Sequence, residues 1–120
     1  MATIIVDKDG QSITGPSSMP SDRLFRGAWV ISGTVISEDL ATAKDIFKDK
    51  IREVRKPLLE AEDVVYMKAL ETANTSAQTA SITKKNLLRD ATANSSIDSA
   101  TTIDELKEAW DTSLLGTSPY

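Results

Sequence analysis

The sequence contains no cysteine and no histidine among its 120 residues. Without cysteine the chain forms no disulfide framework and offers no thiol nucleophile, and without histidine it lacks the usual acid–base group near neutral pH. Catalytic triads that depend on either residue are excluded, as are most zinc sites. These absences argue against an enzyme, and we expect no catalytic residue, no metal site and no cofactor.

Aromatic residues are also few, at 5% of the chain, and the five glycines do not cluster into a phosphate-binding loop. The longest apolar runs, Ile4–Val6 and Ala28–Ile31, are far shorter than the roughly 20 residues that span a bilayer. A formal net charge of −4 argues against general nucleic-acid binding. We therefore predict one small cytoplasmic domain that binds neither a membrane nor a nucleic acid.

Residues 1–36 are predicted to form short strands and turns. The segment Thr3–Val6 is β-branched and apolar, and Asp9-Gly10 after it is a dipeptide that tight hairpin turns prefer, because glycine tolerates a positive φ. A second hairpin is expected over Ala28–Ile36, with Ser32-Gly33 at its turn. A lone hairpin is marginally stable in water, so these strands must pair with each other, lie on the helices or join a partner's sheet. We assign this region a partner-binding role.

Residues 37–112 are predicted to be helical. Apolar side chains recur there in steps of four and three, which is the spacing of a heptad repeat. The row consists of Phe47, Ile51, Val54, Leu58, Ala61 and Val65. Proline removes a backbone hydrogen bond and crowds the preceding turn, so a helix over about 38–73 should be kinked or broken at Pro57.

A second helix is predicted over about 77–91, packed antiparallel to the first. A short third helix should begin at Thr102, because Thr102 to Glu105 has the T-x-x-E form of a capping box. Residues 92–101 read as a connector, and residues 113–120 as a flexible tail. The expected fold class is α+β and mainly α, with N-terminal β-hairpins, a long Pro-kinked helix against a second helix, and a short C-terminal helix.

Charged side chains on the long helix form two adjacent rows. The basic row is Lys44, Lys48, Arg52 and Lys56, and the acidic row is Asp45, Asp49 and Glu53. Pairs three residues apart favour a solvated face held by its own ion pairs, and the open alternative is a contact surface for an acidic partner or a nucleic acid. Farther along lie Glu60, Glu62, Asp63 and Glu71, which we interpret as helix surface rather than as acid–base groups of a hydrolase.

Several motif residues of the helical region occur in a recognisable order. The pattern R-x-x-R-x-x-L-L…D is present as Arg52, Arg55, Leu58, Leu59 and Asp63, followed by Leu88-Arg89-Asp90 and then Trp110. Over roughly residues 47–110 this resembles the C-terminal region of bacteriophage tail-assembly and tail-fibre-assembly chaperones. Many relatives have a tryptophan where this chain has Val64, and Trp-Pro where it has Trp110-Asp111.

The resemblance implies a small non-catalytic viral protein that binds phage tail-fibre or tail subunits. Such a protein helps the subunits fold or assemble in the host cytoplasm and can remain on the virion tail. The open alternative is a self-associating structural protein of the particle, a homo-oligomer formed through the heptad row.

Two sets of residues are candidates for specific roles. The first is a structural clamp between helices, because the planar guanidinium of arginine suits paired bonds to a carboxylate; its members are Arg52, Arg55, Asp63, Arg89 and Asp90. The second is a set of partner contacts, comprising Trp29, Phe47, Ile51, Val54, Leu58 and Trp110. For the two tryptophans, membership of the core is the open alternative.

Overall fold

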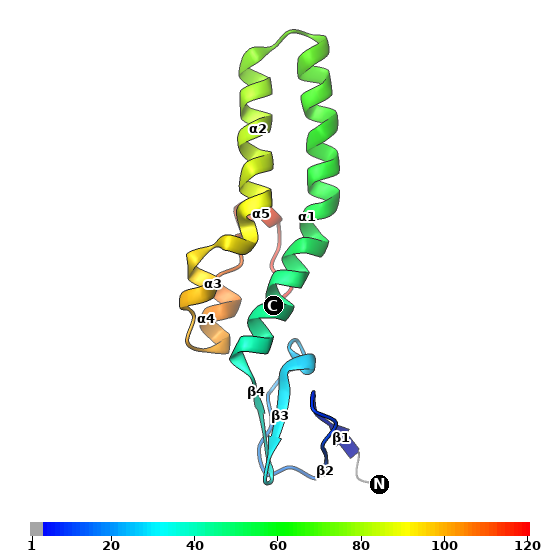
Figure 1. The fold of residues 1–120 in the computed structure, drawn as a ribbon, viewed down its shortest axis with the longest axis vertical. Helices are drawn as coiled ribbons and strands as arrows, with labels where there is room; N and C mark the ends of the chain where they lie inside the picture. Colours follow the sequence, from blue (N-terminus) through cyan, green and yellow to red (C-terminus); the bar gives the residue numbers. More distant parts are fainter. Residues whose placement is uncertain (1–3) are drawn as a thin grey trace.

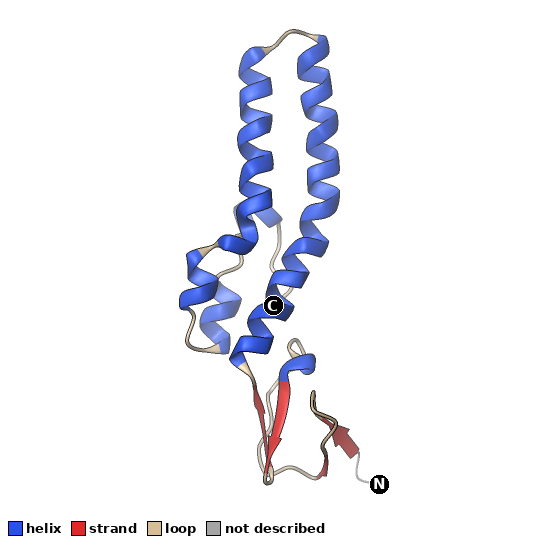
Figure 2. Ribbon diagram, in the orientation of Figure 1, coloured by secondary structure: helices blue, strands red, loops and turns tan. Residues whose placement is uncertain are grey.

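The computed structural model describes residues 4–120 and is α+β and mainly helical, with strands only at one end (Figure 2). A β-module lies at the bottom, a helical body above it, and a two-helix hairpin projects from the body (Figure 1). The radius of gyration is 19.3 Å, against about 14 Å for a compact chain of this length. The molecule is therefore elongated, measuring 65 × 29 × 21 Å. Thr3, at the start of the predicted first strand, lies outside the described residues.

Two antiparallel hairpins make up the β-module. Strand β1 (Ile4–Val6) pairs with β2 (Ser12–Thr14), and β3 (Trp29–Ser32) pairs with β4 (Val35–Glu38). Both predicted hairpins are confirmed. Gly10 and Gly33 occupy the two turns with φ of 83° and 63°, which a residue with a side chain rarely adopts.

The side chain of Asp7 joins the two hairpins. It is almost fully buried, and its carboxylate accepts hydrogen bonds from the backbone N–H groups of Asp9 (2.9 Å), Gln11 (2.8 Å) and Ile31 (2.9 Å). The bond from Ile31 is the main cause that holds the pKa of Asp7 below its usual value, against the opposing effect of burial. The carboxylate thus satisfies the backbone N–H of Ile31 at the edge of β3, where a neighbouring strand would otherwise do so.

The chain itself covers both edges of the β3–β4 ribbon. Beside β3, the N–H of Lys8 donates to the carbonyl of Trp29 (3.0 Å). Beside β4, the N–H of Ser17 donates to the carbonyl of Thr34, and the N–H of Ile36 donates to that of Ser18, both at 2.8 Å. A partner strand that joined this module would therefore have to add to the β1–β2 hairpin.

A 3₁₀ turn, η1 (Arg26–Ala28), and the loop before it connect the β-module to the body. The backbone N–H of Asp39 donates to the carbonyl of Ala28 at 2.7 Å. Lys107 Nζ lies 2.8 Å from Asp22 Oδ2. This hydrogen bond raises the pKa of Lys107 and lowers that of Asp22. The module is thereby tied to two separate parts of the helical body.

The end of β4 carries a carboxylate oxygen that has no hydrogen-bond partner. Glu38 lies directly opposite Trp29 across the ribbon, and Glu38 Oε2 and Trp29 Nε1 are both buried without a hydrogen-bond partner. Burial, with a smaller contribution from the Asp22 carboxylate, raises the pKa of Glu38. The guanidinium of Arg26 lies 4.6 Å from the centre of the Trp29 ring, so a cation covers the indole.

Helix α1 (Leu40–Glu71) is continuous through Pro57, so proline does not divide it into two helices. Figure 1 shows the lower part of α1 tilted relative to its upper part. Helix α2 (Thr75–Arg89) begins and ends two residues earlier than predicted. The reason at its start is Asn74, whose side chain accepts a hydrogen bond from the N–H of Ala77 (3.0 Å) and caps the helix.

Four short helical segments complete the body, and they correct two predictions. They are η2 (Asp90–Ala93), α3 (Ser95–Ser99), α4 (Ile103–Glu108) and α5 (Thr112–Leu115). The capping box at Thr102 and Glu105 is confirmed, with both reciprocal bonds present. The predicted connector 92–101 instead contains α3, which is capped by Asn94.

Residues 113–120 do not form the predicted flexible tail. Asp111 caps α5 by accepting hydrogen bonds from the N–H groups of Ser113 (3.1 Å) and Leu114 (3.2 Å). The pKa of Asp111 is lowered mainly by its hydrogen bond with the Ser113 hydroxyl and, to a smaller extent, by these two backbone bonds. Leu115 is buried, and the ring of Tyr120 stacks on Phe25 and Phe47. Two apolar anchors thus return the end of the described chain to the core.

The hydrophobic core lies at the base of the hairpin, where all segments meet. Its buried members are Phe25, Ala28, Ala43, Phe47, Ile51, Leu88, Ile97, Ala100, Leu106, Trp110 and Leu115. Phe25 and Ala28 come from the N-terminal region that the sequence set apart as 1–36. The β-module and the helical body therefore share this core.

Candidate interaction surface on the helical hairpin

The two long helices meet along a narrow seam. Between residues 60 and 87 the buried side chains are Glu62, Ala69 and Ser81. The Ser81 hydroxyl donates to the carbonyl of Glu62 (3.2 Å), and the Gln78 side chain donates to the carbonyl of Ala69 (3.4 Å). These two bonds fix the antiparallel register. Most larger apolar side chains of the projecting part lie to either side of the seam.

The heptad row of α1 leaves the seam as the helix rises. Phe47 and Ile51 are buried and Leu58 is half-buried, but Ala61 is exposed and Val65 is 48% exposed. A straight α-helix has 3.6 residues per turn, so a row with a period of 3.5 drifts by about 20° in each heptad. The same row that packs into the core at the base therefore faces outward near the tip.

One side of the hairpin, here named the tyrosine face, is formed by Leu59, Tyr66, Leu70, Ile82 and Lys85. Lys85 Nζ lies 2.5 Å from Asp63 Oδ1 and 4.9 Å from the centre of the Tyr66 ring. This contact bridges α1 and α2 over the lower part of the face. Leu70, near the tip, and Ile82, level with Asp63 in the register set by Ser81 and Glu62, are 45% and 47% exposed.

The opposite side, here named the open face, is formed by Ala61, Val65, Ala77, Ala80 and Leu87. Lys84 lies beside the seam on this side, and its Nζ is 3.6 Å from Glu62 Oε2. Helix α5 packs on the base of this face, where a hollow is lined by Ile51, Leu87 and Ala91 together with Leu114 and Leu115. Above α5 the open face has no covering element among residues 4–120.

The predicted clamp is present only in part. Arg55 Nη1 donates to the carbonyls of Arg89 (2.8 Å) and Leu88 (3.4 Å), at the C-terminal end of α2 where the helix dipole is negative. Arg55 therefore joins the two helices through backbone carbonyls rather than through a carboxylate. Asp63 also joins them, but through Lys85.

The other three clamp residues do not join α1 to α2. Arg52 pairs with Asp49 on its own helix at 2.7 Å. Arg89 donates to Asn86 on its own helix at 3.4 Å, and Asp90 begins η2. The prediction was wrong for these residues, because the guanidinium groups of Arg52 and Arg89 reach partners on their own helices.

Four of the six predicted partner contacts lie inside the chain's own core. Trp29, Phe47, Ile51 and Trp110 are buried, and Val54 and Leu58 are half-buried against the same core. Trp110 packs edge-to-face on Phe47 at 5.8 Å and donates from Nε1 to the carbonyl of Gly116 at 3.1 Å.

Half of the basic row holds the body together. Lys44 Nζ donates to the backbone carbonyl of Asp98 (2.8 Å), and Lys48 Nζ pairs with the Asp98 carboxylate (3.2 Å). Of the predicted ion pairs on α1, Asp49–Arg52 is present, whereas Glu53 pairs with Lys50 at 3.4 Å. Lys44 and Lys48 thus anchor α3 to α1, which reduces the basic surface left for an acidic partner.

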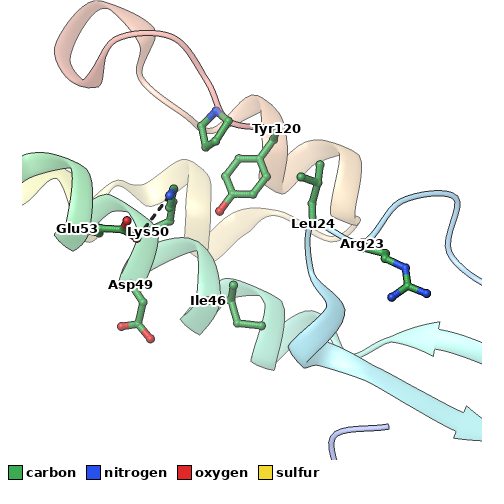
Figure 3. Close-up of a pocket in the computed structure, with 8 residues that line it drawn as sticks. Arg23, Leu24, Ile46, Asp49, Lys50, Glu53 and Tyr120 are labelled. Atoms are coloured by element: carbon green, nitrogen blue, oxygen red, sulfur yellow. Dashed lines mark hydrogen bonds and ion pairs between the residues drawn. The ribbon is translucent and has the colours of Figure 1, made fainter. Parts of the chain in front are cut away.

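A surface groove of about 490 Å³ lies beside Tyr120. Figure 3 shows the Tyr120 ring between α1 and the loop that carries Leu24, with the Lys50–Glu53 ion pair at one side. Arg23 and Asp49 line the groove as well. Its charged groups are of both signs and largely neutralise one another, so the groove has no marked preference for a charged ligand.

Within residues 4–120, no cluster of three or more acidic side chains could hold a metal ion. In the same part of the chain, the helices are all too short or too polar to cross a bilayer. No protein-family model, curated protein or solved structure matches this chain.

Replacing Arg55 with alanine should lower the free energy of unfolding by about 1 kcal/mol, because the carbonyls of Leu88 and Arg89 lose a charged donor at a partly exposed site. Arg89→Ala, which removes a bond within one exposed turn, should change it by less than about 0.5 kcal/mol. Urea unfolding of both variants measures the difference. Equal losses would show that Arg55 does not join the helices.

Proposed function

We propose that the chain is a non-catalytic assembly chaperone or adaptor for bacteriophage tail-fibre or tail subunits. It acts in the host cytoplasm during assembly and can stay on the virion tail. The motif resemblance over residues 47–110 supports the identity of the client. A second support is that two residues of that motif region, Arg55 and Leu88, contact each other across the hairpin.

The observation that carries the proposal is the projecting hairpin with large exposed apolar side chains. A two-helix hairpin standing free of the body leaves most of its surface in solvent. Met67 and Leu70 near its tip, and Ile82 farther down α2, are each more than 40% exposed. Clustered apolar side chains on a protruding element are typical of a protein-binding surface.

We assign client binding to the tyrosine face. Leu70 and Ile82 supply apolar area, and the Tyr66 ring with the Lys85–Asp63 ion pair supplies an aromatic and a polar group between them. A partner helix or extended segment laid along this face would bury apolar anchors and keep a polar rim, as amphipathic recognition requires. The outer edges of β1 and β2 offer a second point of attachment for a β-rich fibre subunit.

Co-expression with a fibre or tail subunit encoded by a neighbouring gene, followed by size-exclusion chromatography, tests the proposal. The wild-type chain should co-elute with the subunit and raise its soluble yield. The double variant Leu70→Glu with Ile82→Glu should lose at least about tenfold in affinity, because two desolvated anchors become charged. Val64→Glu, an equally exposed substitution on the outer side of α1, is the matched control. Absence of a complex with every fibre and tail subunit would overturn the assignment.

A further inference from the structure

We propose that the client segment bound on the tyrosine face has two chemically different ends, with apolar side chains toward the tip of the hairpin and carboxylates toward the body. This inference rests on the proposed function and adds the chemistry of the partner to it. It is carried by Lys56 and Arg89, two cations on neighbouring helices that lie below the apolar residues of the face.

The residue rows of the tyrosine face continue toward the body as basic residues. On α1, Arg52, Lys56 and Leu59 follow one another in steps of four and three, so they share one side of the helix. On α2, Arg89 follows Lys85 by four residues, one turn farther down. Arg52, Lys56 and Arg89 are all exposed, and they are here named the basic end of the tyrosine face.

A hydrogen bond across the seam places the cations of the two helices at one height. Arg55 Nη1 donates to the carbonyl of Arg89 at 2.8 Å, and Lys56 is the next residue of α1. Lys56 and Arg89 therefore flank the seam at the same level of the hairpin. A partner laid along the face would meet both of them together.

The other cations near this face are already compensated within the chain. Lys85 pairs with Asp63 at 2.5 Å, and Arg52 pairs with Asp49 at 2.7 Å. The guanidinium of Arg55 is directed at the carbonyls that end α2. These three groups are therefore poor attractors for a second anion.

Lys56 and Arg89 pair with no carboxylate among residues 4–120. Glu60 lies one turn above Lys56, and Asp90 follows Arg89, but neither forms an ion pair with these cations. The side chain of Arg89 donates instead to the neutral amide of Asn86 at 3.4 Å. Two uncompensated positive charges at one end of an apolar face are complementary to a segment with carboxylates at one end.

The distance between the two ends sets the length of the segment. Leu70 and Lys56 are separated by 14 residues of α1, which is about 21 Å along the helix. A client helix of about four turns spans this distance. A segment bound in the opposite direction would place its carboxylates on Leu70 and its apolar side chains on two solvated cations, so the charges also select the direction of binding.

An acidic polypeptide suits this arrangement better than a nucleic acid does. A nucleic acid carries charge along its whole length and is bound by a continuous track of cations. Here the uncompensated cations occupy only one end of the face, and the middle carries the Asp63 carboxylate. Farther down α1, Lys44 and Lys48 are occupied by Asp98, so the basic row does not continue as a free track.

Titration calorimetry with the fibre or tail subunit that co-elutes with the chain tests the inference. Lys56→Gln with Arg89→Gln should weaken binding about tenfold, because two charge pairs at the rim of the interface are lost. Lys68→Gln with Lys84→Gln removes the same charge from the opposite side of the hairpin and should bind as the wild type does. Circular dichroism should be unchanged in both double variants, because all four side chains are exposed.

The salt dependence of binding separates charge from shape. Raising sodium chloride from about 50 to 500 mM should weaken binding of the wild type and have little effect on the Lys56→Gln with Arg89→Gln variant. Equal affinities and equal salt dependence of the two double variants would overturn this inference and leave the proposed function standing. Failure of every fibre and tail subunit to bind the wild-type chain would overturn both. Binding of single-stranded DNA that is lost in Lys56→Gln with Arg89→Gln would assign the basic end to a nucleic acid and overturn this inference alone.

Zero-length cross-linking of the complex with a carbodiimide identifies the carboxylates. The reagent activates a client carboxyl group, and attack by the Lys56 amine forms an amide and releases the reagent as a substituted urea. Mass spectrometry should find Lys56 joined to an acidic stretch of the client that adjoins apolar residues. The amide between Lys85 and Asp63, which lie 2.5 Å apart, is the internal control. A client joined through Lys84 and not through Lys56 would contradict the inference.

Discussion

Phe47→Ala should lower the free energy of unfolding by about 3–5 kcal/mol. The side chain of Phe47 is fully buried at the base of the hairpin, where its ring packs on Trp110 at 5.8 Å and on Tyr120 at 5.3 Å. Removing the ring leaves a cavity at the meeting point of α1 with the C-terminal segments. Because small domains are stable by only about 5–15 kcal/mol, this loss should remove a large fraction of the protein's total stability.

Urea unfolding followed by circular dichroism measures this loss. Phe47→Leu keeps most of the apolar volume and should cost less than about 1.5 kcal/mol. Val64→Ala, on the exposed side of the same helix, should change stability by no more than about 0.5 kcal/mol. If Phe47→Ala were as mild as Val64→Ala, the core would not be centred on this ring.

Tyr120→Ala should cost about 2 kcal/mol, although the residue lies in a segment that the sequence marks as flexible. Its ring stacks on Phe25 at 5.0 Å and on Phe47 at 5.3 Å, and it meets Trp110 edge-on at 5.9 Å. Aromatic pairs contribute about 0.5–1.5 kcal/mol each beyond the area that they bury. An effect near zero would show that Tyr120 is not docked in solution.

The ionisation of Tyr120 gives an independent readout. Burial, assisted by the Glu53 carboxylate, raises the pKa of Tyr120 to about 12. Because the folded-state pKa lies above the ordinary value of 10.0, the associated stability is complete below pH 10 and is lost as the pH rises toward 12. Ultraviolet titration in a Tyr66→Phe background should place the midpoint near 12, and Tyr120→Phe should remove this alkaline loss.

The two faces of the hairpin differ in their side chains and in how far they are covered. The tyrosine face, to which we assign client binding as a proposal, is partly closed by the contact between Lys85 and Tyr66. The open face consists mostly of small side chains and lies above α5.

The sequence by itself determined the local elements of this protein. The Asp9-Gly10 and Ser32-Gly33 turns, the extent of the long helix and the capping box at Thr102 were all predictable, because each depends on residues within one or two turns of chain. Whether Pro57 kinks that helix or divides it was not predictable. The heptad row from Phe47 was predictable for the same reason.

Only the tertiary structure decided which side of that row is covered, where Arg55 finds its acceptors and whether Tyr120 is free. The row turns outward at Ala61 and Val65 because the helix period is 3.6 rather than 3.5 and because α5 and the core cover only the base. Arg55 binds carbonyls more than 30 residues away, and Tyr120 docks on Phe25 from the other end of the chain. Contacts over such separations depend on how the whole chain packs, so no local sequence pattern could predict them.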